Sequence, residues 1–246
     1  MKVMVLVGLV IGLASYDLAQ AEPVKVEGAD TNVIAVVLGK KITAKEKDQL
    51  NGIIFGTLLQ QYAKKHRIEP TDEELDAFVR RTEAMDKRRH AKLERDRERL
   101  KKELKSASLS DRDREGKQSE LATIESILKS TRELKEQTKG ADVMARSANR
   151  RIAHQFVMSW KINKALYAEY GGRIIFQQAG VEPLDAYRNF LKDQEKKGAF
   201  RIMDKQYEPG FWRYFTNDAM HTFYEKGDGA TFINTPWWMM DEPPEE

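Results

Sequence analysis

The most constraining part of the chain is the stretch from residue 33 to residue 80, because it joins a strand pattern to helix-start signals. Residues 34–38 form a short apolar run that ends at Gly39, which predicts a strand followed by a turn. Thr43 and Glu46 then have the spacing of a capping box, in which each side chain bonds the backbone N–H of the other residue. The pattern predicts a strand, a turn and a capped helix, in that order.

The helix predicted after this capping box is amphipathic. Its apolar stripe has i, i+3, i+4, i+7 spacing and consists of Leu50, Ile53, Ile54, Thr57, Leu58 and Tyr62. His66 and Arg67 supply cations that suit the negative end of the helix dipole, so we expect the helix to end there. Thr71 and Glu74 then form a second capping box, which begins a second helix.

The order of these elements resembles the N-terminal domain of SurA-type periplasmic chaperones and parvulin foldases. The matching residues lie in the strand, the capped turn, the first helix and the Pro-Thr-Asp-Glu-Glu segment. They are Ile34, Ala35, Val36, Val37, Gly39, Ile42, Thr43, Glu46, Leu58, Leu59, Ala63, Lys64, Lys65, Ile68, Thr71, Asp72, Glu73, Glu74 and Asp76. Where the family usually has Asn before the turn glycine, this chain has Leu38.

The resemblance implies two long-range contacts. The first strand is expected to pair with a strand from late in the chain, either residues 173–177 or residues 230–233. A partner is also expected on physical grounds, because an unpaired apolar strand edge invites aggregation. The helix of residues 148–170 is expected to return and pack on the first long helix. The side chains expected to meet are Ile53, Ile54, Leu58 and Tyr62 on one helix and Ile152, Phe156 and Trp160 on the other.

The amino terminus has the parts of a secretory signal peptide. Lys2 precedes an apolar run, residues 3–14, and Ala19-Gln20-Ala21 provides a small-x-small cleavage site. The run is shorter than the about 20 residues that a spanning helix needs. We therefore expect a mature chain that begins at Glu22, without a transmembrane segment. The alternative to cleavage is a signal peptide that is retained as a membrane anchor. The absence of cysteine favours the bacterial periplasm for an exported chain of this size.

Residues 80–140 are rich in charge and are expected to form a long antiparallel helical hairpin. Residues 80–117 contain 15 Lys or Arg and 9 Asp or Glu, although the whole chain has a net charge of only +3. The two signs alternate and aromatic residues are absent, which argues against nucleic-acid binding. The pattern favours a solvated hairpin with i,i+4 ion pairs. A basic arm that attracts acidic client segments or anionic lipid head groups is the alternative.

Residues 171–246 are expected to add a strand, a helix that begins at Pro183, and a tail rich in aromatic residues. We expect this tail either to form a small C-terminal core or a segment packed on the helical body, or to be a surface that binds clients or a partner. Aromatic residues are suited to both roles. The candidate client-binding residues are Phe55, Leu59, Phe211, Trp212, Trp237 and Trp238.

The sequence offers no catalytic constellation. The motifs of a parvulin isomerase domain are missing, and there is no Cys nucleophile and no G-x-S-x-G motif. The four histidines, His66, His90, His154 and His221, lack the spacing of metal ligands to one another. We therefore expect no catalytic residues, no metal and no cofactor. An enzyme, either an isomerase remnant or a hydrolase, is the least favoured hypothesis.

Together these patterns predict a mostly α fold: a SurA-N-like helical body with one short two-stranded sheet and a long projecting antiparallel helical hairpin. The expected segments are a signal peptide (1–21), a flexible lead (22–32), a SurA-N-like domain (33–170) carrying the hairpin (about 80–140), and the C-terminal part (171–246).

The function that the resemblance implies is that of a periplasmic chaperone-like protein without isomerase activity. Its partners would be unfolded or partly folded envelope proteins, and nucleic acid is not expected as a partner. The alternative is a structural or accessory subunit whose hairpin makes a coiled-coil contact with a dedicated partner or with a second copy, which leaves a homo-oligomer open.

Overall fold

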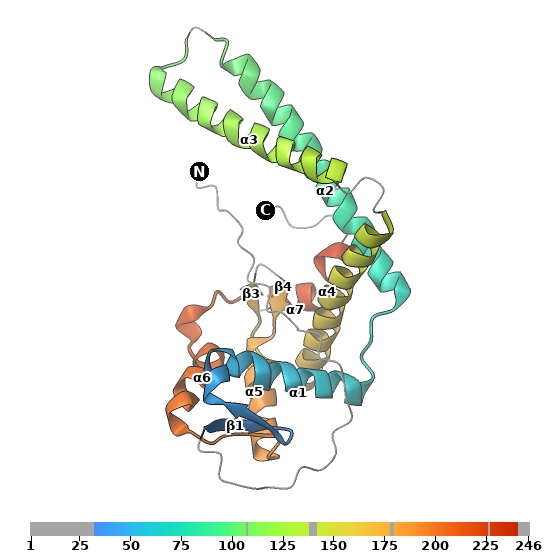
Figure 1. The fold of residues 1–246 in the computed structure, drawn as a ribbon, viewed down its shortest axis with the longest axis vertical. Coiled ribbons are helices and arrows are strands. Elements are labelled where there is room, and N and C mark those ends of the chain that lie inside the picture. Colours follow the sequence, from blue (N-terminus) through green and yellow to red (C-terminus); the bar gives the residue numbers. More distant parts are fainter. Residues whose placement is uncertain (1–31, 107, 138–141, 178–179, 226, 241–246) are drawn as a thin grey trace. The chain divides into compact units, whose positions relative to one another are not determined.

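The protein is mostly α-helical, as predicted, and it divides into two compact units (Figure 1). The computed structural model describes residues 32–106, 108–137, 142–177, 180–225 and 227–240. One unit, which we call the sheet unit, joins Met1–Pro70 to Gln155–Glu246, and the hairpin unit is Thr71–His154. The expected signal peptide, nearly all of the flexible lead and the acidic carboxyl end lie outside the described residues.

The division into units differs from the one predicted at residue 170. Residues after 170 share one core with residues before Pro70, so they belong to the same unit. The physical reason is that each of these short segments has too little apolar surface to fold alone, so segments from both ends of the chain must combine.

Three strands form an antiparallel sheet in the order β2-β1-β5. They are β1 (Val33–Val37), β2 (Lys40–Thr43) and β5 (Phe200–Ile202). The turn between β1 and β2 places Leu38 (φ 48°) and Gly39 (φ 82°) in the left-handed region. This is the position where the resembling family has Asn, a residue that tolerates such a conformation better than Leu does.

The predicted partners of the first strand were wrong. Residues 230–233 lie in α7 (Asp228–Asn234), and β3 (Ile175–Gln177) pairs with β4 (Gly180–Glu182) in a separate two-stranded sheet. The actual late partner, β5, follows α5 (Leu184–Lys196) directly. Gly198, at a φ of 71°, reverses the chain between them, so a short helix–turn–strand connection supplies the partner.

Both predicted capping boxes are present. Thr43 and Glu46 cap a 3₁₀ turn (Ala44–Gln49) that leads into α1 (Leu50–His66), and Arg67 ends α1 in the left-handed conformation at a φ of 54°. Thr71 and Glu74 cap α2 (Asp72–Glu103) in the hairpin unit.

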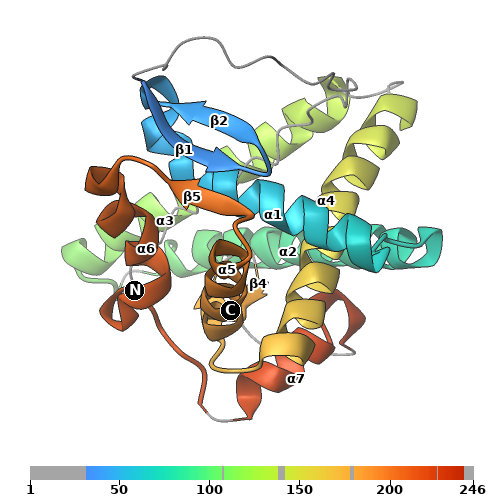
Figure 2. The ribbon, with the colours of Figure 1, turned by 90° about the horizontal axis from the view of Figure 1, so that it is seen from below.

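The core of the sheet unit lies between α1, α5, the three-stranded sheet, α6 (Glu208–Thr216) and the last turns of α4 (Asp142–Tyr170). Figure 2 shows the three strands at one edge, next to α1, α5 and α6. The largest side chains in this core are at most 2% exposed. They are Phe190, Phe200, Phe211, Phe215, Ile42, Ile54, Leu58, Leu166, Ile175, Leu184 and Leu191.

The stripe of α4 that joins this core is not the one predicted. Ile152 is 49% exposed, whereas Ile162 and Leu166 lie in the core with Leu58. The Tyr62 hydroxyl also donates to Glu169, 2.8 Å away, near the end of α4. Ile152 falls in the hairpin unit, so only the later turns of this long helix carry the apolar face that the sheet unit covers.

In the hairpin unit, α2 and α3 (Asp111–Gln137) run antiparallel (Figure 1). Their seam is thin and consists of Leu93, Leu100, Leu121, Ile124 and Leu128. Ion pairs between the two helices supplement it: Lys101 of α2 with Glu125 of α3, and Lys117 of α3 with Glu103 of α2. None of the helices in the described part of the chain has both the length and the apolar composition needed to cross a membrane.

Candidate functional site

The six predicted client-binding residues are all buried or half-buried, and four of them, Phe55, Leu59, Phe211 and Trp212, lie in or against the core of the sheet unit. Phe211 is 1% exposed and Trp238 is 7% exposed. The other four, Phe55, Leu59, Trp212 and Trp237, are half-buried. Burial of this kind is typical of an aromatic tail that packs on the helical body, which is the alternative to a client-binding surface. It leaves little of these side chains exposed for a client to bind.

Specific contacts hold these aromatic residues in place. The ring of Phe55 lies edge-on to Tyr187, with 4.8 Å between centroids, and to Phe215, at 5.3 Å. Trp160 of α4 donates its Nε1–H to the carbonyl of Ile233 at 2.8 Å and stands edge-on to Trp238 at 5.8 Å. The carboxyl-terminal tail is therefore fastened to α4 by a hydrogen bond as well as by packing.

A different aromatic residue, Phe176 on β3, is the most exposed large apolar side chain described in the sheet unit, at 57%. Its ring centroid lies 6.0 Å from that of Tyr224, and Tyr224 lies 5.2 Å from Phe232 of α7. We call these three residues the aromatic face. Three adjoining rings, one of them more than half exposed, make a continuous apolar surface rather than a scattered residue.

The pleat of β3 explains why Phe176 points outward. Side chains alternate along a strand, so Ile175 is fully buried while its neighbour Phe176 faces away from the core. On the same face, Val181 of β4 is the cross-strand partner of Phe176. A short extended segment, Thr222 to Tyr224, lies along the other edge of β3 and brings Tyr224 beside Phe176.

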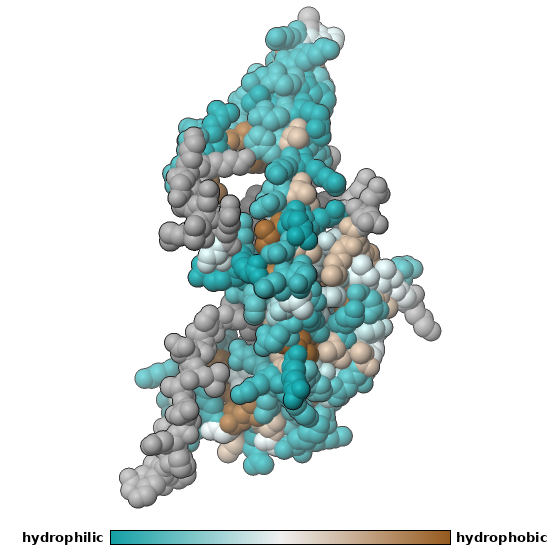
Figure 3. Space-filling model, turned by 90° about the vertical axis from the view of Figure 1, so that its right-hand side faces the viewer, coloured by the Kyte–Doolittle hydropathy of each residue, from teal (hydrophilic) through white to brown (hydrophobic). Residues whose placement is uncertain are grey.

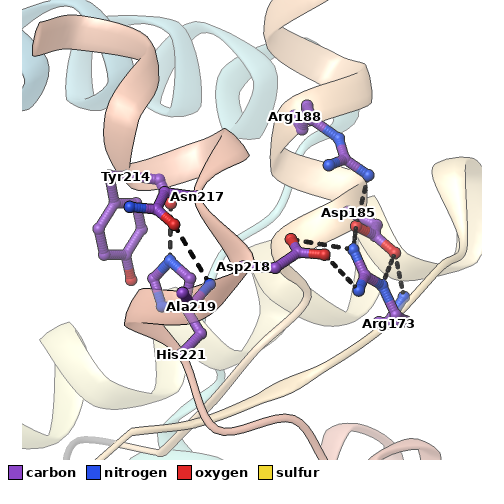
Figure 4. A network of polar contacts seen from close by, with 8 residues as sticks. All are labelled: Arg173, Asp185, Arg188, Tyr214, Asn217, Asp218, Ala219 and His221. Atoms are coloured by element: carbon purple, nitrogen blue, oxygen red, sulfur yellow. Dashed lines mark hydrogen bonds and ion pairs between the residues drawn. The ribbon is translucent and has the colours of Figure 1, made fainter.

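A polar network fixes the segment that carries Tyr224 (Figure 4). Arg173 donates from Nε to Asp185 Oδ2 at 2.9 Å and from Nη1 to Asp218 Oδ2 at 2.7 Å. Arg188 donates to the other oxygen of Asp185 at 2.6 Å. The Arg173 guanidinium also lies 4.2 Å from the ring centroid of Phe223, a cation–π contact.

The charges in this network alter the pKa values of both carboxyl groups. Burial alone would raise the pKa of Asp185, but the hydrogen bonds from the Arg173 side chain and backbone N–H outweigh it and lower that pKa. Hydrogen bonding from Arg173 lowers the pKa of Asp218 as well. Both aspartates are therefore ionised at neutral pH, where they hold Arg173 between α5 and the segment after α6.

Gly172 makes this network sterically feasible. Its φ is 99°, and a Cβ at this position would lie 2.3 Å from the Cβ of Asp185. No other residue type fits there without moving α5, so the turn after α4 requires glycine.

A second polar cluster lies between β4 and α6. The Tyr214 hydroxyl donates to Glu182 at 2.6 Å. His221 Nε2 donates to the Tyr214 carbonyl at 2.7 Å (Figure 4). Desolvation raises the pKa of Glu182, although Tyr214 and His221 oppose the shift. His221 Nδ1 is buried and has no hydrogen-bond partner among the described residues. The cluster links β4 to the segment that carries His221, and it presents no nucleophile.

A pocket of about 290 Å³ lies between α1, the end of α4 and α5. Leu58 and Phe190 contribute apolar surface, while Lys65, Glu169 and Lys197 contribute charge. Glu169 accepts from Tyr62, and Asp193 nearby accepts from both Tyr170 and Lys197. Glu169 and Lys197 of the pocket wall therefore each have a partner within the protein.

The part of the chain that the structure describes contains no cluster of three or more residues able to hold a metal ion. The aromatic face was not found from the sequence, although residues 173–177 were expected to form a strand. The usable signal was the alternation of Ile175 and Phe176, because it puts one of the two on the outer face of any such strand. Comparison of the chain with protein-family models, curated proteins and solved structures finds no match.

Proposed function

We propose that this protein is a chaperone-like binding protein of the periplasm that holds apolar segments of unfolded or partly folded envelope proteins, without isomerase activity or a cofactor. The observation that carries the proposal is the aromatic face, with Phe176 57% exposed beside Tyr224 and Phe232. Full burial of one large apolar side chain is worth about 1.5–3 kcal/mol. A fold that leaves Phe176 in water gives up much of that stabilisation, which a bound apolar segment would restore.

Two further features support the proposal. The signal-peptide pattern of residues 1–21 favours export, and the strand, tight turn and capped helix between Val33 and His66 have the order of the resembling chaperone domain. Aromatic residues are enriched where proteins bind one another, because they bury a large area with few rotatable bonds.

The test compares Phe176→Ser with Met203→Ser. Both side chains are more than half exposed, at 57% and 53%, but Met203 lies outside the aromatic face. We expect the natural protein and Met203→Ser to delay aggregation of a urea-denatured outer-membrane protein, measured by light scattering. Phe176→Ser should lose most of that effect at the same melting temperature.

If Phe176→Ser and Met203→Ser delay aggregation equally well, the aromatic face is not the surface that binds clients. A natural protein that never delays aggregation, even at several-fold molar excess, would overturn the chaperone function altogether.

A second candidate function, that of an accessory subunit, is favoured by one feature of the hairpin unit. Ile127 (39% exposed) and Leu134 (62% exposed) lie one heptad apart on α3, beside the seam with α2. Apolar residues at this spacing suit a further helix from a partner or a second copy. If the natural protein does not delay aggregation of the outer-membrane protein and sediments as a dimer, the accessory-subunit function is favoured over the chaperone function.

A further inference from the structure

Residues 217–225, which we call the strap, follow α6 on the way to α7, and Thr222 to Tyr224 among them lie along β3. The side chains of residues 217–220, 222 and 225 are all exposed. Apart from one 3₁₀ turn, Asp218–Met220, the strap has no regular secondary structure of its own.

The strap bonds to β3 as an added strand would. The Phe176 N–H donates to the Thr222 carbonyl at 2.9 Å, and the Tyr224 N–H donates to the Ile174 carbonyl at 3.0 Å. Ile175 and Phe223 face each other in an antiparallel bridge between these two bonds. The other edge of β3 is taken by β4. The strap therefore occupies the single edge of β3 that another extended chain could use.

The side chains of the strap show what this edge accepts. Phe223 turns inward, packs against the core and lies beneath the Arg173 guanidinium. Tyr224, the next residue, turns outward beside Phe176. Two successive aromatic residues in an extended segment thus fill both faces of the edge.

The strap is held at its start by contacts that solvent reaches. The side chains of Arg173 and Asp218, which form the ion pair at 2.7 Å, are 45% and 46% exposed. Exposed ion pairs contribute little to stability. His221 adds one hydrogen bond to the Tyr214 carbonyl. A chain that replaced residues 222–224 would restore both backbone bonds and both aromatic contacts, so the exchange loses little.

We infer that the edge of β3 is a docking edge for an extended, aromatic-rich segment of an unfolded protein, and that the strap covers it until such a segment replaces Thr222 to Tyr224. Docking by strand addition gains affinity from main-chain bonds, while the side-chain positions supply selectivity. The inference rests on the proposed client-binding function and specifies the kind of segment bound and the place where it binds.

The test uses the strap itself as the probe. A fluorescently labelled peptide with the sequence of residues 217–225 should bind weakly to the natural protein and several-fold more tightly to Asp218→Asn, in which the strap loses its ion pair with Arg173 while Arg173 keeps its ion pair with Asp185. Amide hydrogen exchange at Phe176 and Tyr224 should be faster in Asp218→Asn. A peptide with Ser in place of its Phe and Tyr should not bind.

The matched control is Glu208→Gln, which removes the ion pair of Glu208 with Lys205 at the start of α6 and leaves the strap contacts intact. It should bind the peptide as the natural protein does. Unchanged exchange in Asp218→Asn, or faster exchange without tighter peptide binding, would overturn the inference. If the inference fails while Phe176→Ser still loses its effect on aggregation, the client-binding function stands and only strand addition is rejected.

Discussion

The sheet unit and the hairpin unit solve the problem of stability in different ways. The sheet unit buries a large cluster of aliphatic and aromatic side chains, among them Phe190, Phe200 and Phe211 at 2% exposure or less. In the described part of the hairpin unit, the cluster between α2 and α3 has three buried residues, Leu100, Ile124 and Leu128. Figure 3 shows a predominantly hydrophilic surface over α2 and α3 at the top of the view.

The difference follows from composition. Between residues 80 and 117 most side chains are charged, so two helices can bury only a narrow seam between them. The ion pairs along α2, such as Arg99–Asp96 and Arg97–Glu94, lie at the surface, where each contributes little. We therefore expect the sheet unit to resist unfolding more than the hairpin unit does, and to carry the rigid aromatic face.

The largest predicted effects come from truncating one buried leucine in each unit. Leu58→Ala and Leu100→Ala remove the same atoms from sites that are 1% and 0% exposed. Each should cost about 2–5 kcal/mol of its own unit's stability. Leu58→Ala should lower the main thermal transition, whereas Leu100→Ala should speed amide exchange in α2 and α3 and leave α1 and β1 protected.

Ile152→Ala serves as the control for this pair, because its side chain is 49% exposed. It should change stability by less than either leucine variant. If Leu100→Ala lowers the protection of α1 as much as that of α3, the two units unfold together and the contrast between them is wrong.

The local parts of the fold were predictable because their causes are local. Thr43 and Glu46, like Thr71 and Glu74, satisfy backbone N–H groups within one turn of chain, so spacing alone identifies them. The apolar stripe of α1 is likewise visible in the sequence, and Leu50, Ile54, Leu58 and Tyr62 are buried as that stripe predicts.

The non-local parts were not predictable, for two physical reasons. A short apolar segment pairs equally well with several others, so the sequence does not indicate β5 as the partner of β1. A long helix with several apolar residues can bury different stripes along its length, and the chain buries Ile162 and Leu166 instead of Ile152. The aromatic tail fits a core and a surface equally well until its neighbours are known, which is why the aromatic face was missed.

The next prediction contrasts two carboxyl groups of the sheet unit whose pKa values shift in opposite directions. The folded state lowers the pKa of Asp185, so Asp185 stabilises the fold above its ordinary pKa of about 4, and this contribution is lost as the pH falls further. The folded state raises the pKa of Glu182, so its contribution is full below its ordinary pKa and is lost as the pH rises through the raised value.

Asp185→Asn should therefore lower the melting temperature at pH 7, and the deficit should shrink below about pH 4. Glu182→Gln should raise the melting temperature at pH 7, because an amide still accepts from Tyr214 without a buried charge, and the gain should vanish toward acid pH. Melting curves of the three proteins across this pH range provide the measurement. Parallel pH profiles for the two variants would mean that the two carboxyl groups are not shifted in opposite directions.

The smallest predicted effect concerns the ion pairs of the hairpin unit. Lys117 of α3 bonds Glu103 of α2 at 2.5 Å and lowers the pKa of Glu103, whereas Arg97 and Glu98 pair at 2.9 Å within α2 alone. Glu103→Gln should slightly speed amide exchange at the ends of α2 and α3, and Glu98→Gln should have less effect. The Debye length falls from about 10 Å at 0.1 M to about 3 Å at 1 M ionic strength, and exposed ion pairs stabilise less in high salt. The difference between the two variants should therefore shrink in high salt. A difference that stays undiminished there would mean that Glu103 acts through packing of its side chain against the seam, and the hairpin would then depend on buried contacts more than the contrast with the sheet unit allows.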